Sequence, residues 1–306
     1  MSTPREYRFV QVDVFTDRVF GGNPLAVVLE ARGLADGEMQ AIAKEMNLSE
    51  TTFLLAPTRP ECAMRVRIFT PGRELQFAGH PTIGTAWVMA TQGLVAGAPS
   101  QFALEEGIGP VPVTLEGDSK NPSFIWMRHG EPDFGPEMEN RAEIAGALGL
   151  TEADLIAGAP IQTGSTGSRF MFVPLRDRAT VDRALLDVPK IITALGDQPL
   201  VGVFVFAPDP DPAAGRVHSR MFAPHTSGIP EDPATGSATG PLGAYLVKQR
   251  LIKAGDGPVQ VVSDQGVKMG RHSRLHIRGV IRDGRLREIE VGGGVVPVIE
   301  GRLRVP

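Results

Sequence analysis

Three residues of this 306-residue chain have side chains suited to proton transfer: Glu50, His80 and Asp232. Moving a proton at carbon needs a group that both takes and returns it, and carboxylates and imidazoles are the usual choices. Each residue also has a purely structural interpretation. Glu50 could be an exposed carboxylate after a helix, His80 could hydrogen-bond near a helix start, and Asp232 could cap a helix. Because the three residues lie on or near two similar segments of the chain, a role in proton transfer is favoured over a purely structural one.

Two segments half a chain apart resemble one another. The matched pairs, with a single one-residue gap, are Arg67 and Arg220, Phe69 and Phe222, Pro71 and Pro224, Pro81 and Pro233, Gly84 and Gly236, and Ala86 and Ala238. This alignment makes His80 equivalent to Asp232, and Thr85 equivalent to Ser237. A period of about half the chain is too long for a solenoid and predicts two similar domains that face one another.

The elements that position the candidate residues follow from residue patterns. Glu50 stands where a helix capped by Asp36 and ended by Asn47 passes into a strand, Thr51 to Leu55. Pro81 at the first helical position predicts a helix to Thr91, and Pro233 to Lys248 predicts the matching one. The remaining pattern is many short strands, with a linker at Gly130 to Pro136. We therefore expect an α+β fold whose two pseudo-symmetric domains are each a barrel-like antiparallel sheet wrapped around a central helix.

The two predicted helix starts point to anion binding. Backbone N–H groups at a helix start lack partners within the helix, and they attract negative charge. Two such ends facing across a cleft could hold a carboxylate, or stabilise the charge that develops when a carbon acid loses its proton. The hydroxyls of Ser237 and Thr85 could add donors.

Composition excludes several classes of function. The net charge of −4 and the isoelectric point near 5.9 argue against nucleic acid and anionic lipid as partners. No signal core or membrane-length apolar run is present, which indicates a cytoplasmic protein. Cys62, predicted on a strand, is the single cysteine, so a two-thiol mechanism is excluded. No nucleotide or dinucleotide motif occurs, and the His272 and His276 pair lacks the context of a zinc site. We expect no cofactor and no metal.

The chain resembles the PhzF family, the phenazine biosynthesis-like isomerases, which share the diaminopimelate epimerase-like fold. The resemblance spans nearly the whole chain and rests on five stretches: Gly22 to Val27, Glu45 to Phe53, Arg67 to Gly84, Arg220 to Gly240, and Gln265 to Arg271. It implies a homodimer of two-domain subunits, with residues 1–129 and 130–294 forming the domains and the active site in the cleft between them. It also implies that the last strand, about 295–306, completes the first domain.

The same resemblance assigns roles to individual residues. Glu50 matches the family's general acid/base, and His80 and Asp232 match its polar partners. The predicted substrate-binding residues are Asn23, Ser49, Gly79, Gly236 and Ser237. Related epimerases carry a cysteine on each duplicated loop, and neither loop has one here.

The expected function is a cofactor-independent isomerase. It would shift a proton, and a double bond with it, on a small carboxylate-bearing metabolite. One alternative is a one-base epimerase or racemase of a carboxylate substrate. Another is a small-molecule-binding homologue that has lost catalysis.

Overall fold

The computed structural model describes residues 5–196, 202–223 and 230–306. The chain divides into two compact units. Of the described residues, the first unit holds 5–128 and 292–306, and the second holds 129–223, without 197–201, and 230–291. Pro224 of the sequence repeat, and the first two residues of a strand expected from Leu200 to Phe206, lie outside the described residues.

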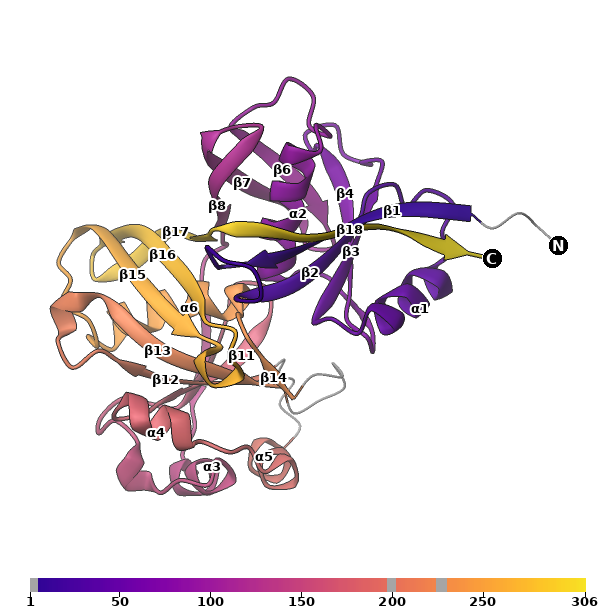
Figure 1. Cartoon of the computed structure of the whole chain (residues 1–306). Coiled ribbons are helices and arrows are strands. Elements are labelled where there is room, and N and C mark those ends of the chain that lie inside the picture. The colour runs from indigo at the N-terminus through magenta and orange to yellow at the C-terminus, as the bar shows by residue number, and fades with distance from the viewer. Residues whose placement is uncertain (1–4, 197–201, 224–229) are drawn as a thin grey trace. The chain divides into compact units, whose positions relative to one another are not determined.

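The first unit is built on one sheet, in which β18 pairs with β1 although the two come from opposite ends of the chain (Figure 1). Pairing then runs β1, β2, β3, β4, β6, β7, β8, and only β2 with β3 and β4 with β6 are parallel. The strands are β1 (Arg5–Val14), β2 (Asn23–Val28), β3 (Glu50–Leu55), β4 (Met64–Phe69), β5 (Glu74–Leu75), β6 (Gln101–Glu106), β7 (Gly109–Asp118), β8 (Asn121–Arg128) and β18 (Val295–Val305).

One buried helix, α2 (Gly79–Thr91), lies within the curve of this sheet. It packs against β1, β2, β3, β8 and β18. Gly84 permits this approach, because a Cβ there would lie 2.6 Å from Leu25 and 2.7 Å from Val14. The opposite face of the sheet is covered by α1 (Asp36–Met46), whose Met39 and Ala43 pack against Phe53 and Phe69.

The second unit repeats this order of strands. Pairing runs β9, β10, β11, β12, β13, β15, β16, again antiparallel except for two pairs, β11 with β12 and β13 with β15. The strands are β9 (Asp133–Glu137), β10 (Gln162–Ser165), β11 (Arg169–Pro174), β12 (Gly202–Pro208), β13 (Arg216–Phe222), β14 (Glu231–Asp232), β15 (Gly257–Gln265), β16 (Ser273–Arg282) and β17 (Arg285–Gly293). The central helix is α6 (Gly236–Lys248).

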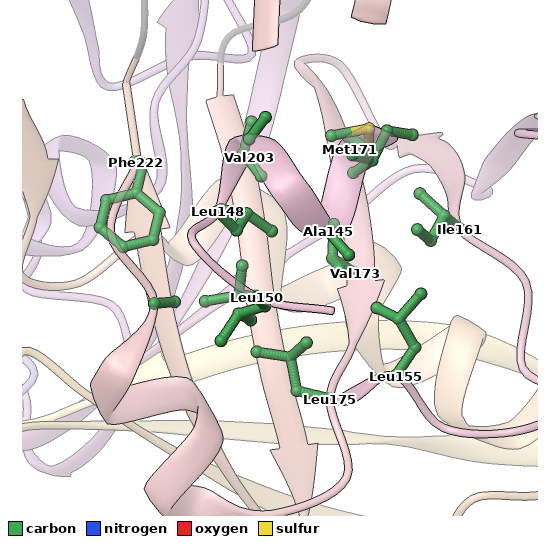
Figure 2. Close-up of a cluster of buried hydrophobic side chains, with 14 of the residues drawn as sticks. Ala145, Leu148, Leu150, Leu155, Ile161, Met171, Val173, Leu175, Val203 and Phe222 are labelled. Atoms are coloured by element: carbon green, nitrogen blue, oxygen red, sulfur yellow. The ribbon is translucent and has the colours of Figure 1, made fainter. Parts of the chain in front are cut away.

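The strands of the second unit bury side chains on both faces, as their alternation requires. Four phenylalanines of β11 and β12, among them Phe172 and Phe204, face α6. The intervening residues, including Met171, Val173 and Val203, face a second cluster with side chains from α3 (Arg141–Ala147), α4 (Arg178–Arg183) and α5 (Val188–Leu195). Figure 2 shows these three residues together with Ala145 of α3. The predicted α+β class, with a sheet around a central helix, is confirmed.

The structure confirms the internal repeat and corrects its register. Arg67 is hydrogen-bonded through Nε and Nη2 to Glu74, and Arg220 is bonded through the same atoms to Glu231. In each unit the arginine also lies over a phenylalanine ring two residues further on. Because Glu74 and Glu231 begin the equivalent strands β5 and β14, the later parts of the repeats align 157 positions apart.

This register places the two central helices in step. Gly79 and Gly236 are their first residues, so both helices span 13 residues. His80 is therefore equivalent to Ser237 and not to Asp232, whose counterpart is Leu75. Pro81 is the third residue of α2, not the first, and Pro233 precedes α6. The expected matches of Gly84 with Gly236 and of Thr85 with Ser237 are wrong for the same reason.

Three local predictions also fail. The predicted linker at Gly130 to Pro136 contains most of β9, which pairs with β10, a strand that the sequence did not reveal. Ala35 and not Asp36 is the N-cap of α1, and Glu38 accepts its backbone N–H. Cys62 is buried, but β4 begins after it at Met64. Within the described residues, no helix has the length and apolarity needed to cross a membrane.

Candidate functional site

In the first unit, Asn23, Glu50 and His80 come together from three elements. Asn23 begins β2, Glu50 begins β3, and His80 is the second residue of α2. His80 Nε2 lies 3.2 Å from Glu50 Oε2. The amide of Asn23 approaches the other ring nitrogen, with 3.0 Å between Nδ2 and Nδ1. The imidazole is thus held between an amide and a carboxylate.

Burial decides the charge of this imidazole. The His80 side chain is 4% exposed, and burial lowers the pKa of His80 to about 3, although a backbone hydrogen bond at Pro24 opposes the change. The ring is therefore neutral at physiological pH. The Asn23 amide contacts Nδ1 of this neutral ring, and Nε2 is the nitrogen that faces Glu50.

The Glu50 carboxylate keeps a limited opening to its surroundings. Its side chain is 14% exposed, while its neighbours Ser49 and Thr51 are buried. Such a carboxylate can exchange a proton with a bound molecule and is shielded from most bulk water. The interpretation of Glu50 as a fully exposed surface carboxylate is therefore wrong.

The start of α2 offers backbone donors beside this group. Ala78 is the N-cap, and no described side chain caps the helix. Gly79 and His80 thus present N–H groups, whereas Pro81 has none to offer. Behind this turn, the Thr82 hydroxyl lies 2.7 Å from the Ala78 carbonyl oxygen and 2.6 Å from Glu106 Oε1.

In the second unit, the candidate residues surround the start of α6. The Thr235 hydroxyl donates to Asp232 Oδ2 over 2.6 Å. Gln265 donates through Nε2 to the Asp232 carbonyl oxygen over 2.8 Å and accepts the Thr235 backbone N–H over 3.1 Å. Asp232, Thr235 and Gln265 are all buried. Asp232 is thus the acceptor of a hydroxyl and not a helix cap, since Thr235 is the N-cap residue.

Gly236 and Ser237 are the first two residues of α6, and no described side chain caps this helix either. Their N–H groups match those of Gly79 and His80 in α2. The pair of anion-attracting helix starts expected from the sequence is therefore present, one in each unit.

The predicted site residues form two groups in the structure. Asn23, Ser49, Glu50, Gly79 and His80 belong to the first unit, and Asp232, Gly236 and Ser237 to the second. Sequence reasoning missed Thr235, Gln265 and Glu106. Thr235 and Gln265 stand inside stretches that carry the family resemblance, but they are 30 positions apart and only the folded chain brings them together.

Comparisons with known proteins agree with this architecture. The family model for phenazine biosynthesis-like proteins, PhzC-PhzF, matches residues 12–301. The chain is 37% identical over 297 residues to trans-2,3-dihydro-3-hydroxyanthranilate isomerase of Pseudomonas aeruginosa, covering 97% of this chain and 99% of that protein.

Two solved structures are similar over nearly their whole length. A PhzF-family protein of Bacillus anthracis has a TM-score of 0.86 and 28% identity, covering 98% of this chain and 99% of that one. A predicted epimerase of Pseudomonas aeruginosa has a TM-score of 0.78 and 33% identity, with 97% and 99% covered. These matches confirm the diaminopimelate epimerase-like fold. The chain belongs to the PhzF family of phenazine biosynthesis-like proteins, and it is an isomerase.

Proposed function

We propose that this isomerase moves a proton, and a double bond with it, on a small carboxylate-bearing metabolite, and that Glu50 is its general acid/base. The observation that carries the proposal is the partly open Glu50 carboxylate, 3.2 Å from an imidazole that burial keeps neutral.

The reaction balances with Glu50 alone as the proton carrier. The carboxylate takes a proton from one substrate carbon, and the C–H electron pair becomes a new double bond. The old double bond shifts its electrons to a distal carbon, which takes a proton from Glu50. Neither an oxidant nor a cofactor is required. One base serves both steps because the carboxylate that removes a proton becomes the acid that delivers one, and this acid can exchange its proton with solvent between the steps.

Glu50 is a better candidate for this base than His80. A group whose pKa is about 3 binds protons too weakly to act as a base near neutral pH. The neutral ring can instead restrict the orientation of the carboxylate, since Nε2 lies 3.2 Å from Oε2. His80 is thus assigned a supporting role, with Asn23 in contact with its other ring nitrogen.

The remaining predicted residues are assigned to substrate binding. The N–H groups of Gly79, Gly236 and Ser237 suit the substrate carboxylate or the charge that develops on it, since helix starts favour anions. Ser49 supports binding next to Glu50. In this proposal Asp232 acts on the same substrate molecule as Glu50. The proposal also includes a homodimer in the cytoplasm, and light scattering after gel filtration measures the subunit number.

Epimerisation is the second candidate, because one of the similar solved structures is described as a predicted epimerase. The same carboxylate could remove a proton next to a substrate carboxylate, and reprotonation from the other face would invert that carbon. The two reactions differ in where the proton returns.

Incubation in D2O separates the candidates. The panel contains trans-2,3-dihydro-3-hydroxyanthranilate, the compound in the name of the 37%-identical relative, together with small unsaturated and saturated chiral carboxylic acids. Deuterium at a distal carbon with a shifted double bond supports the proposal. Deuterium at an inverted carbon identifies an epimerase. Binding of panel members with neither deuterium uptake nor a changed product contradicts both and identifies a binding protein.

A further inference from the structure

The amide of Gln265 has a fixed orientation, which determines the direction of the hydrogen bonds around it. Its Oε1 faces the Thr235 backbone N–H, a pure donor, and its Nε2 faces the Asp232 carbonyl oxygen, a pure acceptor. Reversing the amide would break both bonds. Gln265 is fully buried, so water cannot replace either one.

This orientation also determines where the Thr235 hydroxyl points. Gln265 Nε2 lies 2.9 Å from Thr235 Oγ1 and can only donate to it. The hydroxyl therefore keeps its own hydrogen for another acceptor, and Asp232 Oδ2 lies 2.6 Å away. The chain of donation runs from Gln265 through Thr235 to the Asp232 carboxylate, and Gln265 also holds the backbone at Asp232 and at Thr235.

The first unit shows that the fold does not need this chain. At the equivalent positions, Asp232 is replaced by Leu75 and Thr235 by Ala78, yet β5 and α2 form with the same register and length. What the two units share is a threonine in the helix, whose hydroxyl bonds back to the N-cap carbonyl: Thr82 to Ala78 and Thr239 to Thr235. The shared bond explains the helix start, and the Asp232 network is additional.

We propose that Thr235 and Gln265 are positioning residues that hold the Asp232 carboxylate in the orientation required for substrate. The inference rests on the proposed function, in which Asp232 contacts substrate. The hydrogen bond from the Thr235 hydroxyl to one carboxylate oxygen selects one rotamer of the Asp232 side chain. Because this rotamer is already fixed in the folded protein, substrate binding loses no further side-chain entropy at Asp232.

Thr235→Val and Thr235→Ser form a matched pair. Valine keeps the shape of threonine and removes the hydroxyl, whereas serine keeps the hydroxyl. Loss of a hydrogen bond to a charged group predicts that Thr235→Val lowers kcat/KM by roughly 10- to 100-fold. Thr235→Ser should restore most of the activity. Gln265→Met removes the amide and keeps a side chain of similar length, so it should also lower kcat/KM. It serves as the test variant if Thr235→Val does not fold.

Crystal structures of the wild type and both Thr235 variants give a readout that needs no substrate. The inference predicts a changed or disordered Asp232 side chain in Thr235→Val and a wild-type one in Thr235→Ser. An unmoved Asp232 in Thr235→Val, unchanged kcat/KM in that variant, or equal losses in both variants would overturn it. A wild-type enzyme inactive on every panel compound would contradict the proposed function, while the structures would still decide the positioning role.

Discussion

Glu106 and Gln265 occupy the same position in the two units. Each is the last residue of a strand that runs parallel to the strand carrying the arginine of the repeat. In the first unit β6 runs beside β4, which carries Arg67, and in the second unit β15 runs beside β13, which carries Arg220. Each reaches a threonine at the start of the central helix, Glu106 to Thr82 and Gln265 to Thr235. The repeat has thus placed a titratable acid in one unit and a neutral amide in the other.

This difference predicts that Glu106 makes folding stability depend on pH. Burial raises the pKa of Glu106 to about 8, against an ordinary value of 4.5. The folded state keeps a proton that the unfolded state has lost, so this contribution is fully present below about pH 4.5 and disappears by about pH 8. Within that window each pH unit lowers the free energy of unfolding by about 1.4 kcal/mol.

Glu106→Gln copies the amide of the second unit and should remove this dependence. Urea unfolding of the wild type and the variant from pH 5 to pH 9 measures it, and the difference between them cancels the other titrating groups. The variant should gain stability relative to the wild type as the pH rises. Parallel curves would show that Glu106 does not titrate in this window.

A second prediction concerns the protonation state of His80. Because its pKa is lowered to about 3, the ring should stay neutral throughout the physiological pH range. The contribution to stability is present above the ordinary pKa of 6.5 and is lost as the pH falls toward 3. Nitrogen-15 NMR of labelled histidine should give one unchanging neutral pattern for His80. A titration near pH 6.5 would contradict the assignment.

Asn23→Asp should favour a positively charged His80 ring, with almost no change in the shape of the side chain at position 23. Asn23 is fully buried and contacts His80 Nδ1, so a carboxylate there would raise the pKa of His80 by favouring the imidazolium. An imidazolium would hold Glu50 in its charged form and weaken it as a base. We expect at least a roughly 10-fold loss of kcat. The exposed Asn121→Asp is the control for added charge, and equal activity of the two variants would contradict the prediction.

The two repeat arginines should differ in their contribution to stability. The Arg220 side chain is 6% exposed, and besides Glu231 it bonds the carbonyl oxygens of Val181, Asp182 and Ala184. Arg67 is more open and pairs with Glu74 and with Asp36, whose side chain is 84% exposed. Urea unfolding should show losses of about 3 to 5 kcal/mol for Arg220→Met and about 1 kcal/mol for Arg67→Met. Equal losses would contradict this ranking.

The sequence was sufficient to predict the two-unit architecture but not the alignment of its halves. Arginine, phenylalanine and helix patterns revealed the repeat. The matching prolines and glycines then suggested a one-residue gap, whereas the pairing of Phe69 with Glu74 and of Phe222 with Glu231 requires four extra residues in the second loop. Strand pairing is set by contacts in the folded chain. Aligning identical residues across loops of unequal length therefore could not reveal the register of the pairing.

The site was predictable where its residues lie in motifs and unpredictable where long-range contacts create it. Glu50 and His80 were singled out by residue type and motif, and the structure brings them to 3.2 Å. Gln265 contacts a helix start 30 positions away, and Glu106 contacts one 24 positions away. Their roles depend on burial and on strand ends, which residue types alone do not encode.

Proton exchange with solvent shows whether Glu50 carries the proton. Glu50→Gln removes the base while keeping its size, and Glu45→Gln makes the same change on the exposed surface of α1. With a substrate of the wild type in D2O, we expect no catalysed deuterium incorporation by Glu50→Gln, with binding nearly unchanged, and wild-type incorporation by Glu45→Gln. Incorporation by Glu50→Gln at the wild-type rate would contradict this expectation.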